Sequence, residues 1–419
     1  MKTSNPNDTE TQNVRQFPRR DWFLLPAMSL LTILVLAVST ESVSRCLFPV
    51  SQTDLENCFV TGDPSGTAPA KPNSVCSERS AESRLLVDYR FNGRGDRDDR
   101  DLQEKQAGSF RIVMIGSSFA MGLFAPRELS FAGLLPEQLS RQTGRRIELY
   151  NESKGGKFRG GPFPIKNSVA RFQDVLSAQP DMILWIITPM DIENSELNDP
   201  DPKPGVVPFD TPRQDRRAAE YKSALSKMMD SMVQGNFGSK LRNRWAQSRS
   251  ALMLRHFLVS SEPPNQYVES YLKNEDDAEF LKIVPSAEWQ QQLQNFETQA
   301  ERFEAQARMS GVPFVGVLVP NRAQAAMIST NSWPSDYDPY RLDHELRKVI
   351  ENNGGIYIDI LKQFRSVPDP EQVYFPLDGH LNVEGHAMIS RMLTNELTSG
   401  AVPSMSESAH PQLRLAQGK

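Results

Sequence analysis

The chain has 419 residues, of which 47 are lysine or arginine and 52 are aspartate or glutamate, so its formal net charge is −5. Proteins that bind nucleic acid usually present a net basic face, so this balance disfavours a nucleic-acid partner. Hydrophobic residues make up 38% of the chain and the mean hydropathy is −0.49, values that exclude a polytopic membrane protein. They still leave enough apolar residues to build a buried core.

An uncharged segment near the N-terminus predicts one membrane-spanning helix. The 19 residues from Trp22 to Thr40 carry no charge. A helix of that length, rising about 1.5 Å per residue, nearly crosses a bilayer core of about 30 Å. Three arginines lie between residues 15 and 20, and only Arg45 follows closely. By the positive-inside rule we expect residues 1–21 in the cytoplasm and the rest exported. This predicts a single-pass protein of the cell inner membrane with a periplasmic or extracellular domain.

Two other interpretations of the segment 22–40 compete with an anchor. A cleaved signal peptide ends in small residues, as Ala37 and Ser39 are here, but a charged lead of 21 residues is long for one. A core helix of a soluble protein can be equally apolar, yet it seldom lies so near a terminus. We therefore expect the helix to stay attached as an anchor.

The next segment, 41–107, predicts an exported linker or stalk. Residues 61–74 are rich in proline, glycine, serine and threonine, and residues 94–105 are a mixed-charge run. The segment also holds all three cysteines, Cys46, Cys58 and Cys76. A disulfide between the last two would stabilise the stalk by roughly 3 kcal/mol and leave the first unpaired. Three free thiols are the alternative.

After residue 108 apolar runs alternate with amphipathic stretches, a pattern typical of a parallel sheet covered by helices on both faces. Each predicted strand is short and rich in β-branched or aromatic residues. The predicted strands are Ile112–Ile115, Ile147–Tyr150, Met182–Ile187, Phe314–Val319 and Ile356–Ile360. Five strands with crossover helices indicate a doubly wound α/β domain, which we place at 108–398, followed by a flexible tail at 399–419.

One helix and one insertion stand out within this domain. Apolar residues between Trp289 and Ala307 recur at spacings of three and four, and Gly311 follows, so we expect a helix whose apolar stripe covers the sheet. The third and fourth strands are separated by more than a hundred residues, too many for a plain crossover. We interpret about 195–285 as a helical insertion that forms a lid or a protein-partner surface over the strand ends.

The first chemical motif is Gly116-Ser117-Ser118, at the end of the first predicted strand. A serine at this place sits at the carboxyl edge of the sheet, where amides at the start of a helix stabilise negative charge on an attacked carbonyl. An ordinary helix-capping serine explains the same residues. A phosphate-binding loop fits less well, because no lysine follows the glycine at the required position.

The second motif is Asp378-Gly379-His380, just before the last amphipathic helix. A carboxylate two residues from a histidine can fix the imidazole tautomer and stabilise the imidazolium formed when a serine loses its proton. A metal site of His380, Glu384 and His386 is a weaker alternative, because the two histidines do not share one helical face. The remaining histidines, His256, His344 and His410, have no comparable surroundings.

Together the two motifs, at opposite ends of an α/β domain, resemble those of the SGNH, or GDSL-like, hydrolase superfamily over about Ser109 to Leu397. The resemblance implies a three-layer, flavodoxin-like fold with a five-stranded parallel sheet. It also implies no cofactor and no metal. The stretch from Tyr89 to Arg94 is similar to the lead segment of membrane-anchored members.

The resemblance also assigns site residues, with two departures. It makes Ser118 the nucleophile, with Ser117 in place of the family aspartate. Asn151 and Gly156 look like the second family block, which implies a substrate-side asparagine and an oxyanion-hole glycine. Asp191 looks like the end of the third block.

In that third block Met190 stands where the family has an oxyanion-hole asparagine. Methionine donates no hydrogen bond, and losing one such donor costs about 10²–10³ in rate. This departure implies an activity that is weak or absent, or an oxyanion hole that is built from other donors.

The expected reaction is acyl transfer by a Ser118–His380–Asp378 triad, with the amides of Ser118 and Gly156 as the oxyanion hole. The anchor and the resemblance together suggest that the substrate is an acyl ester, acetyl above all, on a glycan of the cell envelope. A small ester is the other substrate considered. Water and a sugar hydroxyl both qualify as acceptor. The alternative is a catalytically impaired SGNH-fold protein that binds glycan or serves as a scaffold.

Overall fold

The computed structural model describes residues 20–60, 70–153, 172–193, 248–273 and 278–406. Within these ranges the main sheet has five parallel strands in the order β5-β4-β6-β7-β8. The strands are β4 (Ser109–Gly116), β5 (Arg146–Asn151), β6 (Met182–Ile187), β7 (Phe314–Leu318) and β8 (Ile356–Ile358). All five predicted strands are confirmed, and the order is the flavodoxin-like 2-1-3-4-5 of doubly wound folds.

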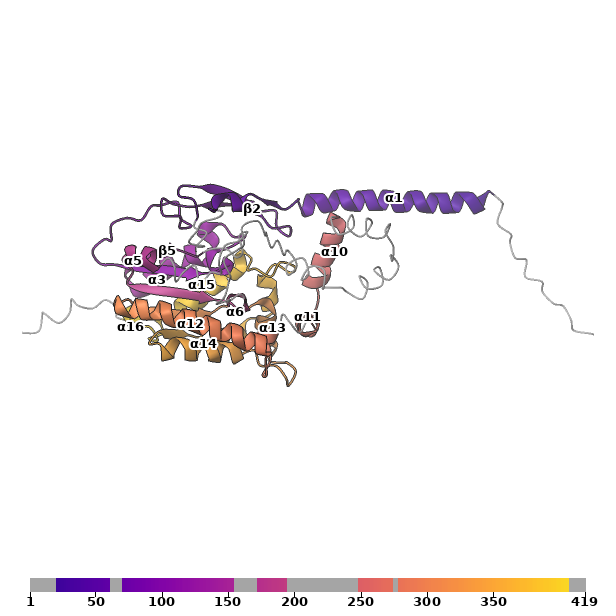
Figure 1. The fold of residues 1–419 in the computed structure, drawn as a ribbon. Helices are drawn as coiled ribbons and strands as arrows, with labels where there is room; N and C mark the ends of the chain where they lie inside the picture. Colours follow the sequence, from indigo (N-terminus) through magenta and orange to yellow (C-terminus); the bar gives the residue numbers. More distant parts are fainter. Residues whose placement is uncertain (1–19, 61–69, 154–171, 194–247, 274–277, 407–419) are drawn as a thin grey trace, which may run out of the picture.

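The strands read as continuous apolar runs because both faces of the sheet are covered. Every residue of β4 and β6 is buried, as expected for a parallel sheet between two helical layers. Right-handed crossovers leave β4 in opposite directions and so put helices on opposite faces. Helix α3 (Phe131–Thr143) packs with α15 (Val383–Thr398), and α12 (Ala287–Met309) packs with α14 (Arg341–Asn352), as Figure 1 shows. The fold therefore has three layers.

Helix α12 confirms the predicted apolar stripe. Phe296 stacks on Trp185 of β6 with ring centroids 5.0 Å apart, and Phe303 packs between strands β6 and β7. Apart from the N-terminal helix, the other described helices are shorter. They are α2 (Ser118–Met121), α5 (Phe172–Ser177), α6 (Pro189–Glu193), α10 (Arg249–Ser260), α11 (Pro264–Leu272), α13 (Arg322–Thr330), α16 (Pro403–Ser406) and the 3₁₀ turns Leu55–Cys58, Arg127–Leu129, Glu279–Leu281, Leu361–Ser366 and Pro370–Val373.

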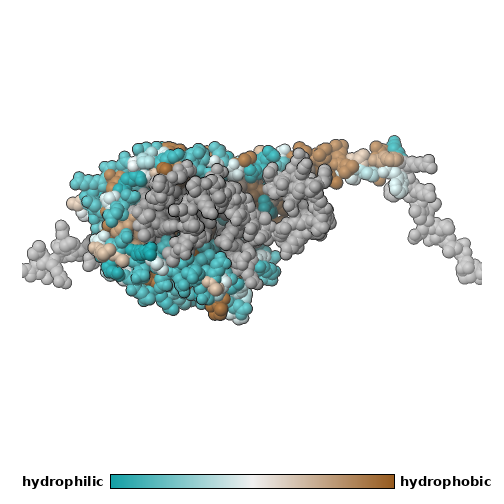
Figure 2. Space-filling view, in the orientation of Figure 1, coloured by the Kyte–Doolittle hydropathy of each residue, from teal (hydrophilic) through white to brown (hydrophobic). Residues whose placement is uncertain are grey.

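The N-terminal helix α1 (Asp21–Leu47) is longer than the predicted span of 22–40 and continues without a break to Leu47. Its stretch Trp22–Leu47 is long and apolar enough to cross a membrane, and none of its most apolar window is buried against the rest of the protein. Figure 1 shows the helix extending away from the α/β body, and Figure 2 shows apolar surface along it. Its continuation beyond 40 brings the end of the helix onto α10, where the carboxylate of Glu41 accepts a hydrogen bond from the Ser248 hydroxyl at 2.7 Å.

The segment 41–107, predicted to be an exported linker or stalk, contains regular structure where it is described. Strands β1 (Gln52–Thr53), β2 (Val75–Arg79) and β3 (Val87–Arg90) form an antiparallel sheet. This sheet and the other described residues between 48 and 107 are here called the N-terminal module. Its small core is continuous with the residues after Ser118. The core consists of Leu55, Cys58, Phe59, Ala70, Cys76, Val87, Tyr89, Phe91 and Met121. Residues 61–69 of the predicted linker lie outside the described part.

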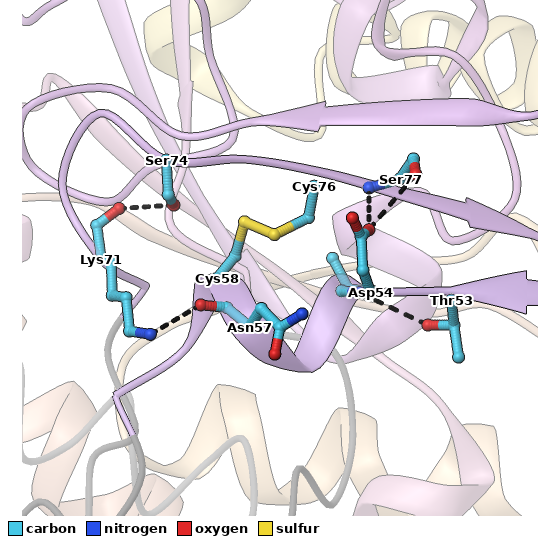
Figure 3. Close-up of a disulfide and its surroundings, with 9 residues drawn as sticks. Thr53, Asp54, Asn57, Cys58, Lys71, Ser74, Cys76 and Ser77 are labelled. Carbon is cyan, nitrogen blue, oxygen red and sulfur yellow. Dashed lines mark hydrogen bonds between the residues drawn. A yellow bond between two sulfur atoms is a disulfide. The ribbon is translucent and has the colours of Figure 1, made fainter.

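A disulfide joins Cys58 to Cys76, with 18 residues of sequence separation, and Cys46 is a free, exposed thiol. Of the two alternatives left open by the sequence, the structure therefore contains the disulfide. In Figure 3 the bond ties the turn after β1 to strand β2, beside the hydroxyl of Ser77, which donates to Asp54 at 3.2 Å. The cross-link lies inside the module's core rather than along a flexible stalk.

The charged run 94–105 is likewise not a linker. Asp96, Arg97 and Asp98 are almost completely buried. Arg94 bridges this run to the sheet domain through Glu152 at 3.1 Å, and Arg127 reaches Asp98 at 2.5 Å. Alternating charges looked solvated in the sequence because their partners lie far away along the chain.

The structure also bears on the predicted insertion and on the predicted C-terminal tail. Within the predicted insertion 195–285 the structure describes α10, α11 and the 3₁₀ turn Glu279–Leu281, whereas 195–247 and 274–277 lie outside the described residues. The predicted flexible tail begins too early, because residues up to 406 form α16 and bury Val402 and Met405 against the main core. The remainder, 407–419, is outside the described part.

Candidate active site

Ser118 lies at the carboxyl edge of the sheet because strand β4 ends at Gly116 and helix α2 begins two residues later. Gly116 pairs with Ile186 of β6. A Cβ on Gly116 would lie 2.6 Å from the Ile186 carbonyl oxygen and 2.7 Å from the Cβ of Ala120. Only glycine therefore permits this close approach, and the sharp exit that follows carries Ser118 to the edge.

The structure brings the three predicted triad residues together. The Oγ atom of Ser118 lies 2.7 Å from Nε2 of His380, and Nδ1 of the same ring lies 2.5 Å from Oδ1 of Asp378. Asp378 Oδ1 also accepts the backbone N–H of His380 at 3.1 Å. One carboxylate oxygen thus holds both the main chain and the ring of the histidine, and the ring points its other nitrogen at the serine.

Aromatic side chains enclose the imidazole. The ring of Phe119 lies 5.0 Å from that of His380, and Phe124 meets it edge-on at 5.7 Å. His380 is only 5% exposed, whereas Ser118 is half-buried. The imidazole is therefore shielded from water, and this shielding strengthens electrostatic interactions at the reacting atoms. The Ser118 hydroxyl remains accessible to a substrate.

Asn151 and Asp191 were both predicted to serve the substrate, and the structure gives both internal partners. Asn151 ends β5 and donates from Nδ2 to the Ala120 carbonyl at 2.9 Å, so it fixes the turn that carries Ser118. Asp191 accepts the N–H of Thr188 at 2.7 Å and the hydroxyl of Ser117 at 3.4 Å. Burial raises the pKa of Asp191 to about 6, while its hydrogen bonds from Thr188 oppose that rise.

The two oxyanion-hole positions after Ser118 differ in what the structure describes. Gly156 lies outside the described residues. Met190 is in α6 and half-buried, in the place where the resemblance has an asparagine. The Ser118 amide stands at the start of α2, where backbone N–H groups point toward the strand ends.

Arg97 and Tyr89 hold the chain after Ser118, and neither was predicted as a site residue from the sequence. Arg97 is buried and donates to the carbonyls of Met121 at 2.5 Å, Gly122 at 2.7 Å and Ala125 at 2.6 Å. Burial lowers the pKa of Arg97 to about 10. Its guanidinium also lies 4.2 Å from the ring centroid of Tyr89.

Tyr89 completes this support. Its hydroxyl accepts the N–H of Phe124 at 2.8 Å, and Phe124 is held at a φ of 63°. Tyr89 belongs to the Tyr89–Arg94 stretch that resembled a family lead segment, and this was the one available signal for the contact. The backbone groups that Arg97 and Tyr89 contact were not predictable, because backbone donors and acceptors carry no sequence signature.

The weaker alternative of a metal site does not match the described geometry. His386 lies in α15 with its ring tilted against Phe131 at 5.3 Å, and burial lowers its pKa to about 3. Within the described ranges no three His, Cys, Asp or Glu side chains are grouped so that they could hold a metal ion.

The geometry therefore defines a serine, an imidazole and a carboxylate hydrogen-bonded in sequence at the carboxyl edge of a doubly wound sheet. This arrangement is able to activate a serine hydroxyl for attack on a carbonyl. No protein-family model matches the chain, and no curated protein matches it.

Among the solved structures that are similar to the chain, two cover 69% of its length, each with a TM-score of 0.33. One is the crystal structure of TesA, at 12% identity and with 98% of that chain covered. The other is the lipase/acylhydrolase from Enterococcus faecalis, at 9% identity and with 96% covered. At these values neither alignment transfers a residue role, so the site rests on its own contacts.

Proposed function

We propose that this chain is a membrane-anchored SGNH-type serine esterase or O-acyltransferase. The observation that carries the proposal is the unbroken set of contacts from Ser118 through His380 to Asp378. Ser118 is far in sequence from Asp378 and His380. A serine that only capped a helix would not be expected to lie in line with such a pair at hydrogen-bonding distance.

In the proposed mechanism the Oγ of Ser118 attacks an ester carbonyl while Nε2 of His380 takes its proton. Asp378 stabilises the imidazolium through Nδ1–H. The imidazolium then protonates the leaving alkoxide, and an acyl-Ser118 ester remains. The oxygen of water or of a sugar hydroxyl attacks this ester next, while His380 accepts its proton. His380 then gives the proton to the Oγ of Ser118 as the acyl group leaves.

The amide of Ser118 is the proposed donor to the oxyanion, with the amide of Gly156 as the second. A methionine at 190 supplies no third donor, and one lost donor typically costs about 10²–10³ in kcat. We therefore expect slow turnover of simple esters. Met190→Asn should raise the rate if the remaining geometry matches that of the family it resembles.

The proposed substrate is an acyl ester, acetyl above all, on a glycan of the cell envelope. This part rests on α1, which would hold the domain close to a membrane on its exported side. Half-buried Ser118, next to an enclosed imidazole, suits a small acyl group presented on a larger polar molecule.

The test is the turnover of p-nitrophenyl acetate and of an O-acetylated glycan by the full chain in detergent, with Ser118→Ala as the control. Release of acetate, or its transfer to a glycan hydroxyl, by the wild type alone would support the proposal. Envelope glycan whose acetylation is unchanged in cells lacking the protein would refute the glycan substrate.

A second candidate is a non-catalytic glycan-binding or scaffold protein of the envelope, favoured by the two departures at Ser117 and Met190. It predicts glycan binding that survives Ser118→Ala, with no acyl chemistry in either form. The same pair of proteins therefore separates the two candidates.

A further inference from the structure

Glu82 is a second carboxylate beside the triad, and the proposed mechanism does not use it. It lies in the N-terminal module, in the turn between β2 and β3, and its side chain is only 2% exposed. Oε2 accepts the backbone N–H of Asp378 at 2.8 Å, and both carboxylate oxygens lie 3.0 Å from the N–H of Leu377.

Helix α10 of the insertion provides another partner for the same carboxylate. Nδ1 of His256 lies 2.9 Å from Oε1 of Glu82, and the positive charge of Arg255 interacts with it electrostatically. Glu82 thus joins three regions that are far apart in the sequence: the N-terminal module, the insertion and the loop that carries Asp378 and His380.

Burying a carboxylate is costly unless N–H donors surround it, and hydrogen bonds to an ionised acceptor are about twice as strong as neutral ones. The backbone N–H groups of Leu377 and Asp378 point at Glu82, so the carboxylate fixes the main chain at the residue whose side chain orients the imidazole. Gly379 follows at a φ of 87° with open space where a Cβ would lie, and its N–H donates to the Phe375 carbonyl at 2.9 Å, so the loop is held by backbone hydrogen bonds of this kind.

We propose that Glu82 is a positioning residue that holds the Asp378–His380 loop in its reactive geometry. This inference rests on the proposed function. Without the carboxylate, the backbone N–H groups of Leu377 and Asp378 lose this acceptor, and the main chain that carries the Asp378 side chain is held less firmly. A misplacement of about 1 Å in such a site costs about 10²-fold in rate.

The proposal predicts a sharp difference between substitutions at this one position. In Glu82→Gln the amide oxygen can replace Oε2 and still accept the N–H groups of Leu377 and Asp378, while its NH₂ group faces His256. Glu82→Ala removes both acceptor oxygens, and Glu82→Met removes them at nearly constant volume. A glutamate important only for charge would not be replaceable by glutamine.

The experiment compares the full chain in detergent with these three variants and with Glu137→Ala, a glutamate that is 68% exposed and paired on α3 with Arg141. Four quantities are measured: kcat and KM for p-nitrophenyl acetate, the rate of inactivation by a fluorophosphonate, hydrogen exchange of the Leu377 and Asp378 amides, and the thermal midpoint.

We expect kcat and the inactivation rate to fall at least about tenfold in Glu82→Ala and Glu82→Met, with KM changed less than about twofold. Both amides should lose their protection from exchange. Glu82→Gln should stay within about threefold of wild type, and Glu137→Ala should match it. If alanine prevents folding, the methionine variant decides.

Equal rates in Glu82→Met and wild type would overturn the positioning role while leaving the proposed function intact. So would equal losses in the methionine and glutamine variants. An unreactive but folded wild type would instead refute the proposed function, and amide exchange would then decide on Glu82 alone. Rapid exchange at Leu377 and Asp378 in the wild type would overturn the inference.

Discussion

The hydroxyl of Ser117 donates to the carboxylate of Asp191 across the carboxyl ends of β4 and β6, at 3.4 Å. Ser117 is one of the two departures from the family that the chain resembles, in which this position is an aspartate. Burial raises the pKa of Asp191 to about 6, which means that its ionised form is already disfavoured beside Ser117. A serine accommodates that group, whereas a second carboxylate would repel it.

Introducing the family residue should therefore damage the site. We expect Ser117→Asp to lower stability, and Asp191→Asn in the same chain to recover part of the loss, with a coupling of about 0.5–3 kcal/mol. Thermal or denaturant unfolding of the two single variants and the double variant at pH 7.5 measures it. Additive effects would show that the two side chains do not interact.

Arg97 supports the chain that follows Ser118, and its loss should reach the nucleophile. Arg97→Met leaves the carbonyls of Met121, Gly122 and Ala125 without this donor, at about 1–3 kcal/mol for a buried unsatisfied group. We expect a lower thermal midpoint and slower labelling of Ser118 by a fluorophosphonate. Arg100→Met is the control, because that side chain is 73% exposed. Equal behaviour of the two variants would contradict this role.

The disulfide predicts one titratable thiol in the denatured, unreduced chain, that of Cys46. Reduction, or Cys58→Ser with Cys76→Ser, should lower stability by roughly 3 kcal/mol. Cys46→Ser should leave stability unchanged, because this thiol is exposed. Three titratable thiols in protein isolated from cells would show that the cross-link does not form there.

Glu304 should make stability depend on pH. It lies on α12, is 2% exposed, and burial raises its pKa to about 8, with Arg308 opposing the rise. A carboxyl group whose pKa is raised on folding stabilises fully below its unfolded value near 4.5 and loses that contribution as pH rises to about 8. Each unit of difference is worth about 1.4 kcal/mol.

Glu304→Gln should therefore gain stability over wild type between about pH 5 and pH 8, and the two should converge below that range. Thermal midpoints at several pH values across the range measure this difference. Other raised groups, such as Glu78 with a pKa of about 7, affect both proteins equally and cancel in the comparison. Parallel curves would mean that Glu304 is ionised in the folded state.

The sheet could be predicted from short apolar patterns, and the triad from two short motifs together with the family that they resemble. A strand buried on both faces must be apolar throughout, as β4 and β6 are, and a serine after a strand-ending glycine lies at the sheet edge by topology. Asp378 and His380 are adjacent enough to be paired by spacing alone.

The N-terminal module could not be predicted in the same way. Its buried charges, Arg97 and Glu82, are satisfied mainly by backbone groups of loops more than twenty residues away. Such partners leave no pattern in the sequence, so the charges looked solvated and the segment looked like a linker. The Ser117 and Met190 departures were visible, but only the structure showed that the first has a matching partner in Asp191.

Covalent labelling tests whether Ser118 is activated in the folded protein. The full chain in detergent is treated with a serine-directed fluorophosphonate, and the adduct is located by peptide mass spectrometry. We expect one adduct on Ser118, none on neighbouring Ser117, and no labelling in Ser118→Ala or His380→Ala. In Asp378→Asn labelling should be slowed by about 10⁴-fold. A folded wild type that remains unlabelled, or labelling that persists in Ser118→Ala, would contradict the account.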